Sequence, residues 1–176
     1  MKKQIDTPKR IVIFGNSGSG KSTLAQRIGK KFNIGHLDLD TVAWLPTEIP
    51  ERATISDSMY NVNAFIDTQQ GWVIEGCYAD LLENIIGQAN LLIFTDLPVE
   101  ACIENARHRS WEPHKYPSEE AQNANLSMLV DWIIHYYTRT DTFSYAAHNM
   151  LFNEYQGTKK RIIKNPVDLA LLHVEI

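Results

Sequence analysis

The sequence contains only two cysteines, Cys77 and Cys102, and their spacing matches no metal-ligand pattern. We therefore expect reduced, packed thiols rather than a thiolate metal site. An apolar run long enough to span a bilayer is also missing, and residues 1–10 lack the apolar stretch of a signal peptide. These absences predict a cytoplasmic protein with no membrane partner.

A large excess of positive charge is missing as well, since 17 Lys and Arg stand against 21 Asp and Glu, a net charge of −4. A local pocket can still bind nucleotides, but this balance disfavours a broad surface for DNA or RNA. The basic run Lys159-Lys160-Arg161 is more typical of a solvated strand edge. The six histidines show no metal-ligand spacing, and an Asn-Lys-x-Asp element for guanine is absent. Nucleic acid therefore remains a secondary alternative.

Apolar runs and helical stripes alternate along the 176 residues. Residues 11–14 are typical of a strand buried on both faces, and the spacing of Leu24, Ile28 and Phe32 predicts a helix after it. Further strands are expected over 34–39, 72–75, 90–95 and 161–163, and further helices over 59–66, 81–86, 119–139 and from Pro98 onward.

This alternation predicts one α/β domain over residues 1–176, with a parallel sheet covered by helices on both faces. Binding is then expected at the carboxyl ends of the strands. Gly71 is expected to end a helix as a left-handed cap, and Asn165 to cap a final helix that begins at Pro166. Residues 110–118, which carry two prolines and two aromatic side chains, are expected to form a flap.

The segment that follows the first strand matches the motif G-x-x-x-x-G-K-S. It reads Gly15-Asn16-Ser17-Gly18-Ser19-Gly20-Lys21-Ser22. Its backbone amides and the start of the next helix are expected to surround the phosphates of ATP. Lys21 would contact the β- and γ-phosphates, Ser22 would coordinate Mg²⁺, and Thr23 would contact the α-phosphate.

Three carboxylates follow the second and third strands. Asp38 and Asp40 alternate at the end of one strand, so both should face the same side near its carboxyl end. We expect Asp40 to act as the base for an acceptor hydroxyl, while Asp38 is a candidate metal ligand. Glu75 is expected to hold Mg²⁺ through water or to serve as a base. The alternative for each is a solvated strand end or a helix cap.

Four segments stand in this order along the chain: residues 10–40, Asp40-x-x-x-Trp44, Trp72-Val73-Ile74-Glu75-Gly76-Cys77-Tyr78 and Phe94-Thr95-Asp96-Leu97-Pro98. Together they resemble the small bacterial P-loop kinases related to adenylate kinase and shikimate kinase, most closely the group often labelled DNA topology modulation protein FlaR. The resemblance implies a three-layer P-loop NTPase fold with five parallel strands in the order 2-3-1-4-5. It also implies an acceptor region at about 41–70 and a lid at about 110–139.

The same resemblance implies roles for residues near the lid and after the last strand. Arg107 and Arg109 are expected near the transferring phosphoryl group, and because they lie two positions apart on a helix only one should face the site. Arg139 is a third candidate, and Asn165 is expected beside the adenine. Ordinary helix-end cations are the alternative for Arg107 and Arg109.

The sequence thus predicts an ATP- and Mg²⁺-dependent phosphotransferase acting on a nucleotide, a nucleoside or another small molecule. Adenylate kinases carry Asp-Gly-x-Pro-Arg after the third strand, whereas residues 75–79 read Glu-Gly-Cys-Tyr-Ala, and the glycine triplet of shikimate kinases is also missing. The identity of the acceptor is therefore open. The alternatives are an ATP-dependent regulatory protein associated with nucleic acid and a nucleotide-binding protein without phosphotransfer. The protein is expected to be a monomer or a homodimer.

Overall fold

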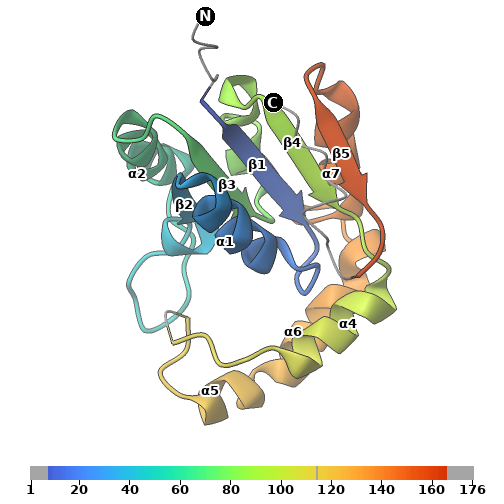
Figure 1. Cartoon of the computed structure of the whole chain (residues 1–176). Helices are drawn as coiled ribbons and strands as arrows, with labels where there is room; N and C mark the ends of the chain where they lie inside the picture. The colour runs from blue at the N-terminus through green and yellow to red at the C-terminus, as the bar shows by residue number, and fades with distance from the viewer. Residues whose placement is uncertain (1–7, 114, 166–176) are drawn as a thin grey trace, which may run out of the picture.

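The computed structural model describes residues 8–113 and 115–165, and its centre is a five-stranded parallel sheet (Figure 1). The strands are β1 (Arg10–Gly15), β2 (Gly35–Asp38), β3 (Trp72–Gly76), β4 (Leu91–Thr95) and β5 (Lys159–Ile162). Their order is β2-β3-β1-β4-β5, and Ile13 of β1 pairs with Glu75 of β3 and with Ile93 of β4. This order, with the glycine loop directly after β1, confirms the predicted P-loop NTPase fold.

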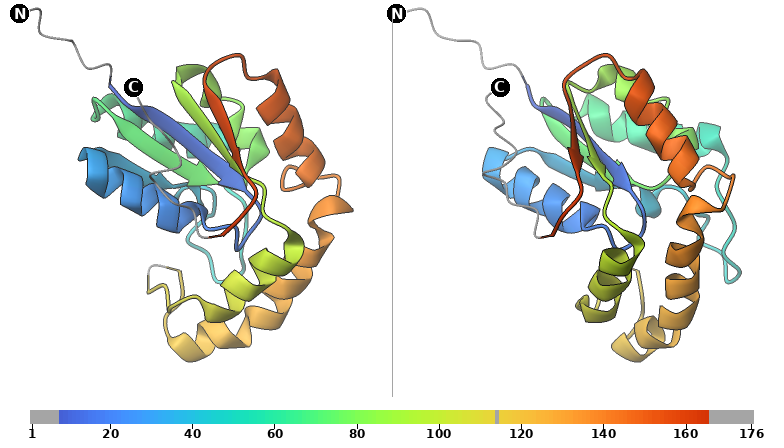
Figure 2. Two further views of the ribbon diagram at one scale, coloured as in Figure 1. Left: turned by 45° about the vertical axis from the view of Figure 1, so that its right-hand side comes forward. Right: turned by 90° about the vertical axis from the view of Figure 1, so that its right-hand side faces the viewer.

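Helices cover both faces of the sheet (Figure 2). Helix α1 (Lys21–Phe32) packs against Ile11 and Ile13 on one face, while Val12 and Phe14 belong to the core on the other face. That second face is covered by α2 (Ile55–Asp67), α3 (Ala79–Leu82) and α7 (Tyr145–Glu154). Because successive side chains of a strand point to opposite faces, a strand between two helical layers needs an uninterrupted apolar run.

The helices α4 (Val99–His108), α5 (Glu119–Ala124) and α6 (Leu126–Ile134) form an arm beyond the carboxyl ends of the strands (Figure 1). Helices α4 and α6 share a small core that includes Cys102 and Ile133. Gln122 of α5 ties the preceding loop to the arm, because its Oε1 accepts a hydrogen bond from the Glu112 N–H at 2.9 Å. The proposed lid, residues 110–139, makes up most of this arm.

Three short 3-10 helices lie in the connections: η1 (Leu39–Thr41), η2 (Ile86–Gln88) and η3 (His135–Tyr137). The helix expected over residues 119–139 is divided at Asn125 into α5 and α6, and η3 follows α6. The helix expected over 81–86 is likewise divided into α3 and η2. Helix α7 was not predicted from the sequence. The expected final helix from Pro166 lies outside the described residues.

The prediction for Gly71 was wrong. Helix α2 ends at Thr68, whose backbone is in the right-handed helical region. Gly71 is required for close packing instead, because a Cβ there would lie 3.0 Å from the backbone oxygen of Lys9 and 2.8 Å from the side chain of Ile34. Within the described ranges, every helix is too short or too polar to cross a bilayer.

Candidate active site

A cavity of about 470 Å³ lies at the carboxyl end of the sheet, between the glycine loop and the arm. From the loop and the start of α1 it is lined by Ser17, Gly18, Gly20, Lys21, Ser22 and Thr23. From the acceptor side and the arm it is lined by Asp40, Cys77, Asn105, Arg109, Lys115 and Tyr116. Segments far apart in the sequence therefore share one cavity.

The glycine loop is held from behind by buried polar contacts. The hydroxyl groups of Ser19 and Thr95 lie 2.6 Å apart, and the Asn16 amide donates to the Ile133 carbonyl at 3.2 Å. Gly18 has a φ of 73°, and a Cβ there would lie 2.2 Å from the carbonyl oxygen of Cys102. Only glycine fits this position, because the backbone is left-handed and helix α4 leaves no room for a side chain.

The first turn of α1 faces the cavity. Gly20 precedes the helix with a φ of 83° and has no side chain with which to cap it, so the amides of the first turn point toward the cavity opening. The Lys21 ammonium donates to the Asn16 carbonyl at 2.8 Å and lies folded over the loop. Ser22 and Thr23 line the cavity from the same turn.

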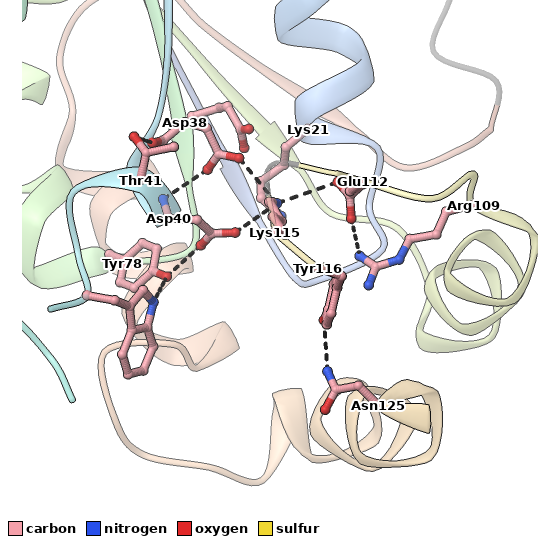
Figure 3. A network of polar contacts seen from close by, with 12 residues as sticks. Lys21, Asp38, Asp40, Thr41, Tyr78, Arg109, Glu112, Lys115, Tyr116 and Asn125 are labelled. Carbon is pink, nitrogen blue, oxygen red and sulfur yellow. Dashed lines mark hydrogen bonds and ion pairs between the residues drawn. The ribbon is translucent and has the colours of Figure 1, made fainter. Parts of the chain in front are cut away.

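Asp38 and Asp40 face a lysine that the sequence analysis did not single out (Figure 3). Lys115 Nζ lies 3.2 Å from Asp38 Oδ2, 2.8 Å from Asp40 Oδ2 and 3.6 Å from the Oε1 of Glu112. Asp38 also caps η1, because its Oδ1 accepts a hydrogen bond from the Asp40 N–H at 2.9 Å. Asp38 therefore caps a short helix, which was the alternative interpretation from the sequence, and it also contacts Lys115.

The two carboxyl groups differ in acidity. Burial, reinforced by the negative charges of Glu75 and Asp40, raises the pKa of Asp38 to about 6. Burial alone would also raise the pKa of Asp40, but the Lys115 ammonium and the hydroxyl group of Tyr78 stabilise the ionised form and bring that pKa below its ordinary value. Asp40 is therefore fully ionised at neutral pH, whereas Asp38, with a pKa of about 6, is mostly ionised there.

Tyr78 and Trp44 complete the acceptor side. Tyr78 Oη lies 2.5 Å from Asp40 Oδ1, and Trp44 Nε1 lies 2.7 Å from Tyr78 Oη. Burial is the main reason that the pKa of Tyr78 is raised, so its hydroxyl group remains protonated. Burial also raises the pKa of the Cys77 thiol to about 12, which keeps this cavity-lining sulfur in its unreactive form.

Two predicted catalytic residues do not line the cavity. Glu75 is only 1% exposed, and its Oε1 lies 3.8 Å from Nε2 of His36, too far for a hydrogen bond. Arg107 is exposed on α4, whereas Arg109 lines the cavity. Arg139 lies 3.4 Å from the ring centre of Trp132 and outside the cavity lining.

The side chain of Arg109 is held beside the cavity by the carboxylate of Glu112 and by the aromatic ring of Tyr116. Its Nη1 lies 2.9 Å from Glu112 Oε2, and its guanidinium group lies 5.7 Å from the ring centre of Tyr116. The hydroxyl group of Tyr116 accepts a hydrogen bond from the amide of Asn125 at 2.8 Å, which links this group of residues to the arm (Figure 3). Among the predicted arginines, Arg109 is thus the one that lines the cavity.

Asn165, which was predicted to lie beside the adenine, lines the cavity and has a partner that the sequence did not indicate. Its amide donates to Asn105 Oδ1 at 2.9 Å, and the Asn105 amide donates to the Gly18 carbonyl at 2.8 Å. Asn105 belongs to no segment singled out from the sequence, and Tyr78 appears there only as the last residue of the segment that begins at Trp72. Only the mixed charges of residues 110–118 could have drawn attention to Lys115.

No protein-family model matches this chain. A protein of Bacillus subtilis (strain 168) described as uncharacterized protein YqaC is 30% identical over 109 residues, which cover 59% of this chain and 58% of YqaC. The match thus spans little more than half the length of this curated relative. The fold is also similar to a shikimate kinase from Acinetobacter baumannii in complex with shikimate and to a shikimate kinase from Bacteroides thetaiotaomicron.

Both shikimate kinase structures are 16% identical to this chain, with TM-scores of 0.46 and 0.45. The similarity covers 83% and 82% of this chain and 92% and 96% of theirs, respectively. At this level of similarity, the fold assignment rests on the strand order and the glycine loop of this chain.

Proposed function

We propose that this protein transfers the γ-phosphoryl group of Mg²⁺-ATP to a hydroxyl group of a small molecule. One observation carries the proposal: a single cavity is lined by the glycine loop and also by Asp40. Phosphoryl transfer requires a donor phosphate and a base for the acceptor hydroxyl within reach of each other.

The residues present fit a magnesium ion that is held mainly by nucleotide phosphates and water. Ser22 lines the cavity, and Asp38, which lies outside the lining, supplies a carboxylate whose pKa is raised mainly by burial and further by the negative charges of Glu75 and Asp40. Within the described ranges, His, Cys, Asp and Glu side chains form no group of three that could bind a metal. That arrangement suits Mg²⁺, which keeps several waters and uses one or two protein ligands. When bound, the ion would neutralise phosphate charge.

The proposed step places each side chain in a distinct role. Asp40 accepts the proton of the acceptor hydroxyl as its oxygen bonds to the γ-phosphorus, and the bond from that phosphorus to the bridging oxygen of ADP breaks. Lys21 and Arg109 stabilise the charge on the transferring group and on ADP. Lys115 must leave Asp40 before this step, since its ammonium contacts the oxygen that would take the proton.

The proposed acceptor is a nucleoside, a nucleotide or another small metabolite. The resemblance to the FlaR group is a finer hypothesis, as is the alternative of a nucleic-acid-associated ATPase. An ATPase would release inorganic phosphate from Mg²⁺-ATP in the absence of any small acceptor, and nucleic acid would change the rate.

The test is transfer of labelled γ-phosphate from ATP across a pool of nucleosides, nucleotides and polar metabolites. We expect one labelled product, loss of the product in Lys21→Ala together with weaker ATP binding, and loss of turnover with near-normal ATP affinity in Asp40→Asn. Unfolding curves of both variants control for the fold. Full activity in a well-folded Lys21→Ala protein would refute the proposal.

A further inference from the structure

Two polar groups, the Trp44 indole and the Tyr78 hydroxyl, form a hydrogen-bonded chain that ends on the proposed base, Asp40, and chemistry fixes its direction. Trp44 Nε1 lies 2.7 Å from Tyr78 Oη, which lies 2.5 Å from Asp40 Oδ1. An indole N–H can only donate, so the Tyr78 oxygen must accept from it. The single hydroxyl proton of Tyr78 is then left to be donated to Asp40.

This direction determines which oxygen of Asp40 faces the cavity. A carboxylate can rotate about its last side-chain bond and exchange its two oxygens. Donation from Tyr78 holds Oδ1 toward the protein, and Oδ2 is the oxygen that contacts Lys115 in the cavity. A hydrogen bond to an ionised acceptor is roughly twice as strong as one between neutral groups, so this preference is substantial.

We propose that Tyr78 and Trp44 are positioning residues that fix the carboxylate of Asp40 with one oxygen aimed at the acceptor. The proposal rests on the proposed function, in which Asp40 is the base. Neither residue needs to touch the acceptor or the phosphates. Their contribution is geometric, and even a small misplacement of a reacting group can slow a reaction roughly a hundredfold.

The surroundings hold the two rings in place. Tyr78 is 2% exposed and packs edge-on against Phe143, with ring centres 5.2 Å apart. The guanidinium of Arg52 lies 4.8 Å from the ring centre of Tyr78 and 5.7 Å from that of Trp44. Arg52 is itself anchored, because its Nη2 donates to Asp80 Oδ2 at 3.2 Å. A cation above two rings and paired with a carboxylate limits their rotation.

The first test detects the hydrogen bonds between Trp44, Tyr78 and Asp40 directly and needs no acceptor. In a ¹⁵N-labelled protein, the indole N–H signal of Trp44 should move when Tyr78→Phe removes its partner, and move less in Asp40→Asn, where a neutral group replaces the charged acceptor. Tyr155→Phe is the matched control, since that hydroxyl donates to the Ala89 carbonyl at 2.8 Å and does not touch Trp44. A Trp44 indole signal that is unchanged in both Tyr78→Phe and Asp40→Asn would overturn the proposal.

The second test uses the acceptor found by the transfer assay. Tyr78→Phe keeps the ring and should lower kcat roughly tenfold to a hundredfold with little change in the KM for Mg²⁺-ATP. Trp44→Phe should show a smaller loss, because Tyr78 can then still donate but is no longer directed. Normal kcat in Tyr78→Phe would overturn the positioning role. If the wild-type protein transfers phosphate to no compound in the pool, the proposed function fails. The Trp44 indole signals still decide whether Tyr78 holds the carboxylate of Asp40.

Discussion

Lys115 Nζ lies 2.8 Å from Asp40 Oδ2, so the loop of the arm places an ammonium group where the acceptor hydroxyl would have to approach. The two carboxylates, Asp40 and Asp38, outweigh burial and raise the pKa of Lys115, which keeps the ammonium charged. If Asp40 is the base that we propose, acceptor binding and arm position are linked, because both depend on the same carboxylate oxygen.

Replacing Lys115 should therefore ease acceptor binding. We expect Lys115→Met to lower the apparent KM of the acceptor by roughly fivefold, since a partly exposed ion pair contributes about 1 kcal/mol at most. Lys115→Arg keeps the charge and serves as the control. The measurement is initial rate against acceptor concentration, and equal KM values in the two variants would show that Lys115 does not compete with the acceptor.

The two arginines near the end of α4 form a matched pair. Arg109→Ala should reduce kcat by orders of magnitude with little loss of ATP affinity, as expected for a contact made mainly in the transition state. Arg107→Ala should leave kcat near wild type, because Arg107 is exposed and lies outside the cavity lining. Steady-state kinetics and ATP titrations separate the two effects. The reverse result would assign the role to Arg107.

Movement of the proposed lid should be visible in tryptophan emission. Trp111 is 44% exposed, and its Nε1 donates to the Tyr116 carbonyl at 3.0 Å, inside the loop that carries Lys115. A non-hydrolysable ATP analogue with acceptor should change the emission of wild type and change that of Trp111→Phe much less. An unchanged response in Trp111→Phe would indicate a static loop.

His148 should make the fold sensitive to acid. It is fully buried, its Nε2 lies 2.9 Å from the Cys77 carbonyl, and its Nδ1 lies 2.7 Å from the hydroxyl group of Tyr136. Burial lowers the pKa of His148 from 6.5 to about 4. The unfolded chain thus binds the proton more readily, so stability should be complete above pH 6.5 and decline by roughly 3 kcal/mol as pH falls toward 4.

Asp38 acts in the opposite direction over part of this range, because its pKa is raised in the folded protein and protonation then favours folding. The experiment therefore compares wild type with His148→Gln, whose amide offers one donor group and one acceptor group and does not titrate in this range. Denaturant unfolding at several pH values should show a smaller loss of stability between pH 6.5 and 4 in His148→Gln. If wild type and His148→Gln lose the same amount of stability between pH 6.5 and 4, His148 is not the cause of the acid sensitivity.

The first strand and the glycine loop were predictable because each depends on local sequence, whereas the strand order was expected only from the family resemblance. Residues 11–14 are apolar without interruption, as a strand between two helical layers requires, and the motif through Ser22 follows at once. Helix α7 escaped prediction because apolar and polar side chains are not separated along it: Leu151 and His148 are both buried. A buried polar residue within a helix weakens the periodic signal.

The acceptor side was predictable only in part. The alternation of Asp38 and Asp40 placed both near one strand end, but their contact with Lys115 depends on how the arm folds back across more than seventy positions of sequence. Glu75 shows the converse, since its place at the carboxyl end of β3 suggested access to the site, whereas the packed side chains around it leave it 1% exposed. Local patterns do not report such packing.

The contact between the Asn16 amide and the Ile133 carbonyl, 117 positions apart, also bears on how the protein is made. The glycine loop leaves the ribosome before the backbone that supports it, at Cys102 and Ile133, has been synthesised. Because chains are synthesised from the N-terminus at roughly 5–20 residues per second, the nascent loop must wait for these partners. A nascent chain that stops before α6 would therefore carry the complete motif and still lack the Ile133 carbonyl that binds the Asn16 amide.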